Sequence, residues 1–378
     1  MDCNLYIINA TAIKYGGALT ILKELLSEIK KTDSKSIYYV FCGIDLDEFV
    51  SDNIRIIKIK TNGHGIGGLK RFYWDSFGLF IFCKKNKINP NLIFSLQNTG
   101  VFYPKVKQLI YFHHAIPLSE YKWNLFRKDE PVLFFYKEIY PFFIRLFINR
   151  RTEFVVQQEF IKNLFSDKFH IDKDKIHLII PDINLNFESK IEKFVLDQKK
   201  FHIFYPTNQA KFKNFEVLFD AISKIRNKSP EIFEKIILHI TLDKDNKDIK
   251  CKIFKLQISN NINLLGNIPY KDVISYYNSV NLLVFPSYIE TFGLPLIEAA
   301  YFGLPILVSD LDYAHEVLKN YQGANFVQFD NSEKWANEII KLSKTNQKVE
   351  SFKKNSVHNS WGKLLELFNT IIKKNVQK

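Results

Sequence analysis

Two successive series of short apolar segments alternate with amphipathic segments, and this alternation constrains the fold more than any other feature. In the first series, NLYIINAT is followed by GALTILKELLSEIKK, whose apolar residues recur at helical spacing, and then by SIYYVFCGI and NIRIIKI. In the second series, FHIFYPT is followed by NFEVLFDAISKIRNK and KIILHITL. Alternating strands and helices are typical of a parallel sheet covered by helices. The sequence therefore predicts two α/β domains of the doubly wound type, with a ligand site in the cleft between them.

The domain boundaries follow from where this alternation stops and restarts. A chain of 378 residues exceeds the size at which a single core usually stops growing. The first series ends near Pro181, and the second begins at Phe201. We expect an acceptor-side domain, a linker, a donor domain and a last helix free to pack back on the first domain, over residues 1–182, 183–200, 201–360 and 361–378.

Composition narrows the class of protein. Hydrophobic residues make up 46% of the chain and charged residues 25%, which is typical of a soluble globular protein. The start, MDCNLYIINA, lacks the basic and apolar regions of a secretory signal, and no stretch has the roughly 18 uncharged apolar residues of a membrane-spanning helix. The cysteines have no CxxC spacing and are expected to be reduced core residues of a cytoplasmic protein, with neither zinc nor disulfides: Cys3, Cys42, Cys83 and Cys251.

The net charge of +13 suits anionic partners, but it comes largely from lysines scattered along the chain. No basic stripe or RNA-reading motif is present, so a nucleic-acid partner is not expected. A more specific feature is PVLFFYKEIYPFFIRLFINRR (Pro131–Arg151), which joins an aromatic face to a basic end. Such a segment is either a core helix with a charged last turn or a helix at a membrane interface. Because aromatic residues along one face of a helix more often pack in a protein core, a core helix is favoured.

Two carboxylates lie eight residues apart in ETFGLPLIEAAYFG, in surroundings that otherwise look apolar. Pro295 suits the first turn of a helix and Gly303 suits its end, so Glu290 lies on the preceding loop and Glu298 one turn into the helix. The N-terminus of a helix that begins just after a strand can bind anions and sugar hydroxyls. A carboxylate can accept two hydrogen bonds from a diol. A solvated helix end is the simpler interpretation of an isolated pair.

The residues around this motif, from Asn267 to Leu318, resemble the family 4 type of glycosyltransferases, the glycosyl transferases group 1. The resemblance rests on Pro-Ser, Glu-x-Phe-Gly-Leu-Pro, Glu-Ala and Gly-x-Pro elements in the family's order and spacing. It implies the GT-B fold, in which two Rossmann-like doubly wound domains face a central cleft. It also implies that Glu298 holds the ribose of the donor nucleotide and that Glu290, with the amides after it, meets the donor sugar. The donor-binding residues implied here are Glu290, Thr291, Phe292, Gly293, Leu294 and Glu298.

The same family places an arginine shortly before a lysine, and both contact the leaving diphosphate. In YPTNQAKFKNFEVL, Lys213 matches the lysine, whereas Asn208 stands where the arginine is expected. Lys211 is a candidate for the missing charge; otherwise the leaving group is stabilised less. Lysines at a helix start oppose the helix dipole, which favours a functional interpretation of this segment. We therefore add Asn208, Lys211 and Lys213 to the nucleotide-sugar site.

The first half offers less specific candidates. Gly16 and Gly17 correspond to the family's glycine-rich loop near the donor phosphates, although a tight turn explains them as well. YFHHAIPL resembles the family's strand ending in His-Asp, with His113 at the histidine position and His114 replacing the acid. A neutral imidazole there can hydrogen-bond the transferring sugar or orient the acceptor hydroxyl. The glycine-rich TNGHGIGGLK (Thr61–Lys70) is either a mobile loop or a gate over a ligand.

The resemblance therefore implies a retaining, metal-independent glycosyltransferase with Glu290, Lys213 and His113 as catalytic residues. Its donor is a nucleotide-diphosphate sugar, which acts as co-substrate, so no cofactor is expected. The implied acceptor is a glycan or lipid-linked glycan of bacterial surface polysaccharide synthesis, such as O-antigen, capsule or lipopolysaccharide. A cytoplasmic location follows, with a peripheral contact to the inner membrane left open. The alternative is a catalytically idle nucleotide-sugar-binding protein of the same fold, which Asn208 keeps open.

Overall fold

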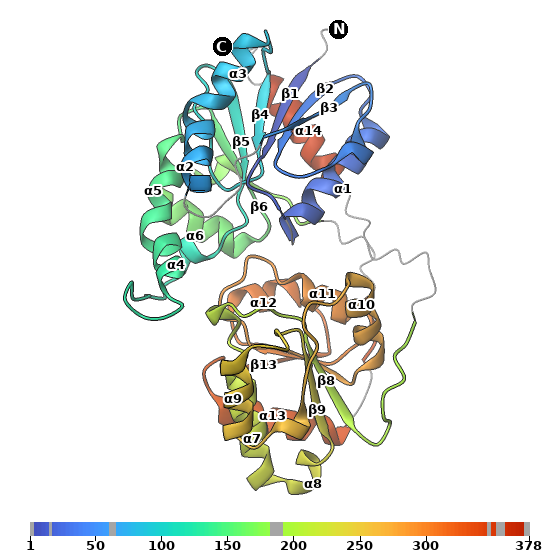
Figure 1. Cartoon of the computed structure of the whole chain (residues 1–378). Coiled ribbons are helices and arrows are strands. Elements are labelled where there is room, and N and C mark those ends of the chain that lie inside the picture. Colours follow the sequence, from blue (N-terminus) through green and yellow to red (C-terminus); the bar gives the residue numbers. More distant parts are fainter. Residues whose placement is uncertain are drawn as a thin grey trace. The chain divides into compact units, whose positions relative to one another are not determined.

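The computed structural model describes residues 4–14, 17–59, 66–181, 192–345, 349–352 and 360–373, except for the side chains of residues 66 and 67 (Figure 1). The chain divides into two compact units. The first contains residues 1–182 together with 357–378, and the second contains residues 183–356. Each unit is built around one parallel sheet, as the alternating pattern predicts.

The sheet of the first unit has seven strands in the order β3-β2-β1-β4-β5-β6-β7. All of its pairings are parallel. Because β2 and β3 lie on one side of β1 while β4 to β7 lie on the other, the loops after β1 and β4 leave the carboxyl ends of these strands in opposite directions. The strands are β1 (Leu5–Ala10), β2 (Ile37–Cys42), β3 (Ile54–Lys58), β4 (Leu92–Ser95), β5 (Lys107–Tyr111), β6 (Thr152–Val156) and β7 (Ile176–Leu178).

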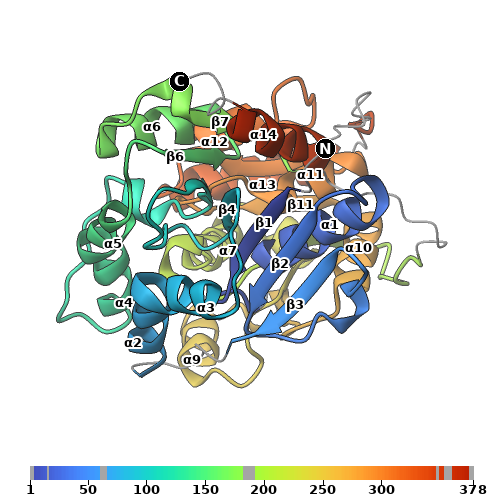
Figure 2. The ribbon, with the colours of Figure 1, turned by 90° about the horizontal axis from the view of Figure 1, so that it is seen from above.

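Helices cover both faces of this sheet (Figure 2). On one face, α1 and α14 pack on Tyr6, Ile8 and Val40. On the other face, the segment from α2 to α3 packs on Ile7, Phe41 and Ile93. The α-helices of the unit are α1 (Gly17–Thr32), α2 (Ile66–Tyr73), α3 (Leu79–Lys85), α4 (Pro131–Phe134), α5 (Tyr140–Leu146), α6 (Glu159–Phe169) and α14 (Ser360–Lys373). Shorter helical turns are η1 (Asp47–Phe49), η2 (Trp74–Gly78), η3 (Ile116–Leu118), η4 (Phe135–Ile139) and η5 (Lys173–Lys175).

The helix α14 belongs to the first unit although it follows the second unit in sequence. The indole of Trp361 donates to Glu24 of α1 at 3.2 Å. The hydroxyl of Tyr6 on β1 donates to Asn369 at 2.9 Å. Trp361, Leu364, Phe368 and Ile371 are also part of the apolar core that β1, β2 and α1 share. Apolar burial and hydrogen bonds thus both fasten α14 to this unit.

The second unit has a six-stranded sheet in the order β10-β9-β8-β11-β12-β13. Its strands are also parallel, and the order reverses between β8 and β11. The loops after these two strands therefore diverge, as they do after β1 and β4 in the first unit. The strands are β8 (Phe201–Tyr205), β9 (Ile236–Ile240), β10 (Ile262–Leu264), β11 (Leu282–Phe285), β12 (Ile306–Ser309) and β13 (Ala324–Val327).

The helices of the second unit follow their strands as in a doubly wound fold. The buried indole of Trp335 lies on α13, which packs against α7. The α-helices are α7 (Glu216–Lys228), α8 (Pro230–Phe233), α9 (Lys247–Lys255), α10 (Tyr270–Ser279), α11 (Leu294–Tyr301), α12 (Asp312–Val317) and α13 (Ser332–Thr345). The shorter turns are η6 (Lys211–Lys213) and η7 (Ser259–Asn261).

The structure differs from the sequence-based expectations in three places. The strands β7 and β13 were not predicted, because each is a short edge strand with little periodicity of its own. Cys42 and Cys83 are buried as expected, but Cys251 is exposed, so the prediction that it is a core residue is wrong; Cys3 lies outside the described residues. The segment Pro131–Arg151 is helical only as far as Leu146, and one of its faces is exposed.

Candidate functional site

The two loops that diverge at the reversal point of the second sheet are joined to each other. One loop follows β8 and contains η6, and the other follows β11. The carbonyl of Phe212 accepts hydrogen bonds from the N–H of Tyr288 at 3.0 Å and from the hydroxyl of Ser287 at 3.2 Å. The side-chain amide of Asn214 donates to the carbonyl of Pro286 at 3.2 Å. These bonds fix the distance between the two loops, and so position the side chains that the loops carry.

Lys213 and Glu290 meet across these loops. Lys213 Nζ lies 2.5 Å from Glu290 Oε1, and the two side chains are 18% and 13% exposed. Asn214, at φ 53°, reverses the chain directly after Lys213, and asparagine tolerates this left-handed conformation better than most residues. The ammonium group also lies 5.8 Å from the centre of the Phe285 ring. Lys213 and Glu290, both predicted as site residues from the sequence, therefore contact each other and place a cation at the reversal point of the sheet.

The start of α11 lies next to this pair. Gly293 precedes the helix at φ 78° and ψ 54°, and Pro295 occupies its first turn. A left-handed glycine lets the chain turn sharply from the loop into the helix, which leaves the first N–H groups of the helix directed outward. The ring of Phe292 is buried in the core, so this residue offers only its backbone to a ligand, whereas Thr291 and Leu294 are partly exposed.

Glu298 lies one turn into α11 and is bound by two tyrosines of α10. Tyr270 donates to Oε1 at 2.8 Å, and Tyr277 donates to Oε2 at 2.9 Å. The glutamate is only 7% exposed. Burial raises the pKa of its carboxyl, and the two tyrosine hydrogen bonds oppose that rise. The sequence reasoning missed both tyrosines, although their spacing of seven residues places them on one face of a helix.

A pocket of about 630 Å³ opens beside Lys213, at the carboxyl ends of β8, β9 and β10. Its walls are formed by Pro206, Thr207, Asn208, Gln209, Lys213, Thr241, Asp243, Asn267, Ile268 and Val273. Polar groups and apolar side chains are thus combined, as in pockets that bind small polar molecules. Of these residues, the sequence had indicated only Asn208 and Lys213.

Asn208 and Lys211 lie on the loop that leads to Lys213. The side-chain oxygen of Asn208 accepts the N–H of Ala210 at 2.9 Å, which shapes the loop that leads to Lys213. A short amide that closes a turn explains why asparagine suits this position. Lys211 is exposed, and it is Lys213 that contacts Glu290. The loop therefore presents one partly buried cation, Lys213, to the reversal point.

In the first unit, Gly17 begins α1, directly after the β1 loop, while Gly16 lies outside the described residues. His113 follows β5, and its backbone N–H donates to Asn98 at 2.7 Å. Its Nδ1 atom is enclosed and has no hydrogen-bond partner among the residues that the structure describes. Burial lowers the pKa of His113 to about 4, so the ring is neutral at pH 7. Gly17 and His113 therefore both follow strands of the first sheet at their carboxyl ends.

His114 is packed differently from its neighbour. Its ring centre lies 4.6 Å from that of Tyr136. Burial, together with His113 and Arg71, lowers the pKa of His114 to about 3. This neutral ring, tilted against the ring of Tyr136, fits a structural role. The predicted gate TNGHGIGGLK has residues 61–65 outside the described part of the chain, and its remainder begins α2.

A buried polar cluster lies at the reversal point of the first sheet, and the sequence reasoning missed it. The carboxylate of Asp75 accepts hydrogen bonds from Gln97 at 2.7 Å and from Asn9 at 3.2 Å. Arg71 Nε lies 3.5 Å from the same carboxylate. Burial raises the pKa of Asp75 to about 6, although Arg71 and the two amides oppose the rise. Four residues from three segments, with Arg71 and Asp75 one turn apart on the same helical segment, therefore form a buried charged cluster near the carboxyl ends of β1 and β4.

Metal ligands were not expected from the sequence. Within the described ranges, no group of three or more His, Cys, Asp or Glu side chains is placed to hold a metal ion. None of the helices in the described part of the chain is both long and apolar enough to cross a bilayer.

The comparison with protein families identifies the second unit. Residues 186–358 match the family described as glycosyl transferases group 1. These residues form a group 1 glycosyl transferase domain. The matched range contains Lys213, Glu290, Glu298 and the pocket beside Lys213.

Curated relatives agree with this assignment. The chain is 24% identical over 247 residues to the O-antigen chain mannosyltransferase RfbU of Salmonella typhimurium, covering 64% of this chain and 66% of RfbU. It is 25% identical over 221 residues to the capsular polysaccharide biosynthesis glycosyltransferase CapM of Staphylococcus aureus, covering 56% of this chain and 54% of CapM. The matches thus span just under two thirds and about half of the length of these two relatives.

Solved structures show that the likeness in fold extends beyond the group 1 domain. WaaG, a glycosyltransferase involved in lipopolysaccharide biosynthesis, superposes with a TM-score of 0.73 at 13% identity, covering 96% of this chain and 99% of WaaG. A glycosyltransferase from Rickettsia africae superposes with a TM-score of 0.69 at 18% identity, covering 99% of this chain and all of the other. The GT-B fold with two Rossmann-like domains, expected from the sequence, is therefore confirmed.

Proposed function

We propose that this protein is a retaining glycosyltransferase that moves a sugar from a nucleotide-diphosphate donor to an acceptor hydroxyl in bacterial surface polysaccharide synthesis. One observation carries the proposal. Lys213 and Glu290 lie 2.5 Å apart at the reversal point of the donor-side sheet, beside a pocket of about 630 Å³. A partly buried cation next to a polar pocket suits a ligand that carries a diphosphate.

The proposed donor pose uses each part of this site once. The ribose hydroxyls bind the carboxylate of Glu298, and the nucleobase enters the pocket near Ile268 and Val273. The diphosphate lies against Lys213 and the first N–H groups of α11, where the partial positive charge of the helix start adds to that of the lysine. The transferring sugar contacts Glu290 and the backbone of Phe292 and Gly293.

The proposed reaction is a same-face substitution at the anomeric carbon. The bond from this carbon to the diphosphate oxygen breaks, and a bond to the acceptor oxygen forms. The acceptor proton passes to the departing diphosphate, so atoms and charge balance without a protein nucleophile. Lys213 stabilises the negative charge that develops on the leaving diphosphate, and such preorganised charge commonly contributes most to the rate. No step of the proposal is assigned to a metal ion or a further cofactor.

His113 is proposed to act on the acceptor. Its neutral ring and enclosed Nδ1 lie at the carboxyl end of β5, where a sugar hydroxyl can be oriented by a hydrogen bond. The proposed acceptor is a glycan or lipid-linked glycan, which the named roles of RfbU and CapM support. Lipid-linked acceptors are found at membranes, so we also propose a cytoplasmic location with a peripheral membrane contact.

A catalytically idle nucleotide-sugar-binding protein is the second candidate, because Asn208 closes a turn where the family carries a second cation. Incubation with UDP-, GDP-, ADP- and CMP-linked sugars, with released nucleotide as readout, separates the two. An enzyme releases nucleotide, and Lys213→Ala lowers the rate on the order of 10² to 10³-fold. Lys255→Ala, an exposed lysine of α9, is the matched control. Binding without release in the wild-type protein would favour the idle protein.

A further inference from the structure

One surface of the first unit exposes an apolar stripe along the helical segment from α4 through η4 to α5. Val132, Phe135, Ile139, Phe142 and Leu146 are all exposed, with Val132 at 64% and Phe142 at 62%. Their spacing of three, four, three and four residues places them on one face of the helix. The opposite face is buried through Leu133, Tyr140 and Ile144. The helix is therefore apolar on both faces. Only its buried face packs against the rest of the unit.

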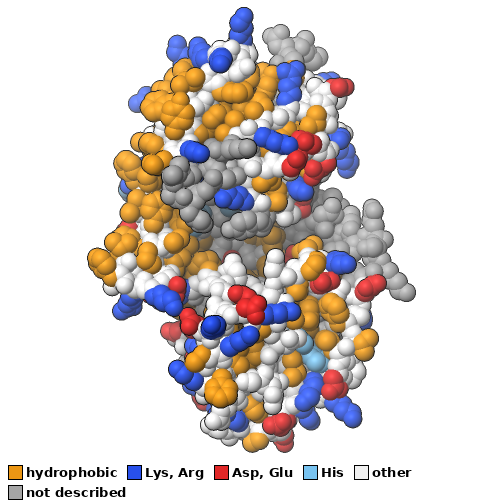
Figure 3. All heavy atoms as spheres, in the orientation of Figure 1, with side chains coloured by type: hydrophobic (Ala, Val, Ile, Leu, Met, Phe, Trp, Pro, Cys, Tyr) orange, Lys and Arg blue, Asp and Glu red, His pale blue; other side chains and the backbone are white. Residues whose placement is uncertain are grey.

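A second exposed stripe runs along the segment from α2 through η2 to α3. Leu69, Tyr73, Phe77 and Ile81 recur every four residues, and all are exposed. The two helical segments that carry the stripes contact each other, because the rings of Phe72 and Phe143 are 5.9 Å apart. Figure 3 shows hydrophobic side chains gathered on this side of the first unit. We call the two stripes together the apolar platform. A contiguous apolar surface of this kind marks an interaction site.

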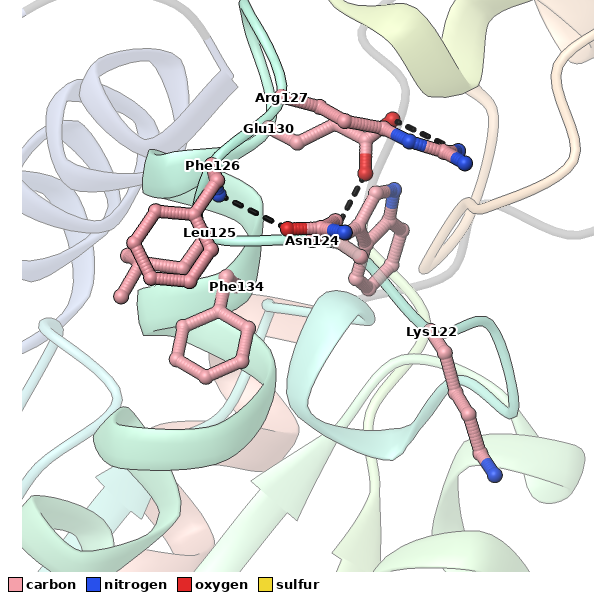
Figure 4. Close-up of a pocket in the computed structure, with 8 residues that line it drawn as sticks. Lys122, Asn124, Leu125, Phe126, Arg127, Glu130 and Phe134 are labelled. Atoms are coloured by element: carbon pink, nitrogen blue, oxygen red, sulfur yellow. Dashed lines mark hydrogen bonds and ion pairs between the residues drawn. The ribbon is translucent and has the colours of Figure 1, made fainter.

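A loop at one end of the platform adds a protruding aromatic residue. Phe126 is 92% exposed, and Leu125 beside it is also exposed. The loop is held in shape by the N–H of Asn124, which donates to buried Glu130 at 2.7 Å, and by the N–H of Phe126, which donates to Asn124 at 2.9 Å. These residues, with Lys122, Arg127 and Phe134, surround a pocket of about 470 Å³ (Figure 4). One hydrogen bond to the buried carboxylate of Glu130 and one to the side chain of Asn124 thus shape the loop that exposes Phe126.

Positive charge is concentrated in the same part of the chain. Residues 66–151 contain 14 Lys and Arg against 5 Asp and Glu, so they carry +9 of the net charge of +13. The lysines are scattered along the whole chain, as expected, and this part stands out because it holds only 5 of the 40 Asp and Glu residues. Lys70 on α2, Lys84 on α3, Lys122 and Arg127 on the loop and Arg145 on α5 are exposed. Long cationic side chains beside apolar residues can reach anionic groups while the apolar groups are buried.

We propose that the apolar platform and the Phe126 loop dock on a lipid bilayer that bears anionic headgroups. The apolar stripes and Phe126 enter the boundary between headgroups and acyl chains, while the surrounding lysines and arginines contact lipid phosphates. A second copy of the chain fits less well, because two surfaces of like charge would face each other. This proposal rests on the membrane contact of the proposed function and names the residues that make it. Its test measures vesicle binding and needs no transfer reaction.

The test uses the full chain and sedimentation with vesicles of phosphatidylcholine alone or mixed equally with phosphatidylglycerol. We expect binding to the anionic vesicles, weakening as salt rises. Phe126→Ser combined with Phe142→Ser should weaken this binding on the order of tenfold or more, because each removes a buried aromatic ring. Lys70→Gln combined with Lys122→Gln should weaken it by about 25-fold, at about fivefold per lost charge, and only with the anionic vesicles.

Matched controls lie in the second unit. Phe254→Ser removes a phenylalanine of α9 that is 76% exposed, and Lys193→Gln combined with Lys199→Gln removes two exposed lysines. These variants should bind vesicles like the wild type. Equal losses in platform and control variants, or no vesicle binding at all, would overturn the proposal. So would a platform variant that changes the oligomeric state in size-exclusion chromatography and leaves vesicle binding intact. The thermal shift caused by nucleotide is measured on every variant as well. If that shift persists while vesicle binding does not behave as expected, the membrane proposal fails and the proposed function does not.

Discussion

The hydroxyl of Tyr270 donates a hydrogen bond to Oε1 of Glu298 at 2.8 Å, and the hydroxyl of Tyr277 donates one to Oε2 of the same carboxylate at 2.9 Å. The two tyrosines differ in their surroundings, since the ring of Tyr270 is exposed and that of Tyr277 is buried. In the proposed function, a ribose diol needs acceptor sites on Glu298. The exposed tyrosine is the one that a ribose can displace, whereas Tyr277 remains as the permanent partner that orients the carboxylate.

Substitution of the two tyrosines should therefore have opposite effects on nucleotide binding. Tyr270→Phe removes the competing hydroxyl and should tighten binding of the preferred nucleoside diphosphate by about fivefold, because a typical net hydrogen bond contributes about 1 kcal/mol. Tyr277→Phe leaves a buried carboxylate oxygen without its donor and should weaken binding by about tenfold or more. Isothermal titration with UDP, GDP and ADP measures both. Equal weakening by the two variants would contradict the distinction.

The two glutamates should be separable by function. A nucleotide at a hundredfold excess over its Kd stabilises the protein by about 2.7 kcal/mol, and Glu298→Ala should abolish that thermal shift. Glu290→Ala should lower the transfer rate on the order of 10² to 10³-fold while changing nucleotide affinity less, because its carboxylate faces the sugar and Lys213. Normal turnover by both variants would refute the site assignment.

The buried carboxyl of Asp75 should make the stability of the first unit depend on pH. Its pKa is raised from 3.8 to about 6, so the stability it contributes is complete below pH 3.8 and is lost as the pH rises through about 6. Asp75→Asn cannot ionise. The free energy of unfolding of the variant, relative to the wild type, should therefore increase by about 2 kcal/mol between pH 4 and pH 7.

Urea unfolding followed by tryptophan fluorescence measures this difference, since Trp74 donates a hydrogen bond to Asn9 beside Asp75. The neutral His113 and His114 act in the opposite direction. Their lowered pKa values, about 4 and about 3, remove stability as the pH falls below 6.5. Because both histidines are present in wild type and variant, their effect cancels in the comparison. A difference that does not change with pH would show that Asp75 remains ionised throughout.

Two glycines should respond to alanine in opposite ways. Gly303 has φ 66°, and a Cβ there would lie 2.4 Å from the backbone carbonyl of Val349. Gly303→Ala should therefore destabilise the second unit by about 1 to 3 kcal/mol. Gly68 lies within α2, and a Cβ added there would meet no heavy atom of the described residues within 4 Å, so Gly68→Ala should stabilise the first unit by about 0.5 to 1 kcal/mol. Urea midpoints measure both effects.

The local pattern of the sequence predicts much of this fold because strands that are buried on both faces are continuous apolar runs. The start of α11 at Leu294 follows from Gly293 and Pro295, and its end follows from Gly303. The short edge strands β7 and β13 lack such a signal, since they pair with one neighbour only.

The candidate site was predictable where its residues lie on the two loops at the reversal point of the sheet. Lys213 and Glu290 are 77 residues apart, but both follow neighbouring strands. Asp75 could not be found in this way. It lies in an aromatic helical segment, and its partners Asn9 and Gln97 come from two separate strand ends. The turn that Asn208 closes depends on the backbone N–H of Ala210, a contact that residue types alone do not specify.

The place of α14 has a consequence for synthesis of the chain. The apolar core formed by β1, β2 and α1 includes Trp361, Leu364, Phe368 and Ile371, which are translated after the whole second unit. During synthesis from the N-terminus, the first unit therefore waits with part of its core open to water while the second unit is made. The domain that is translated first is completed last.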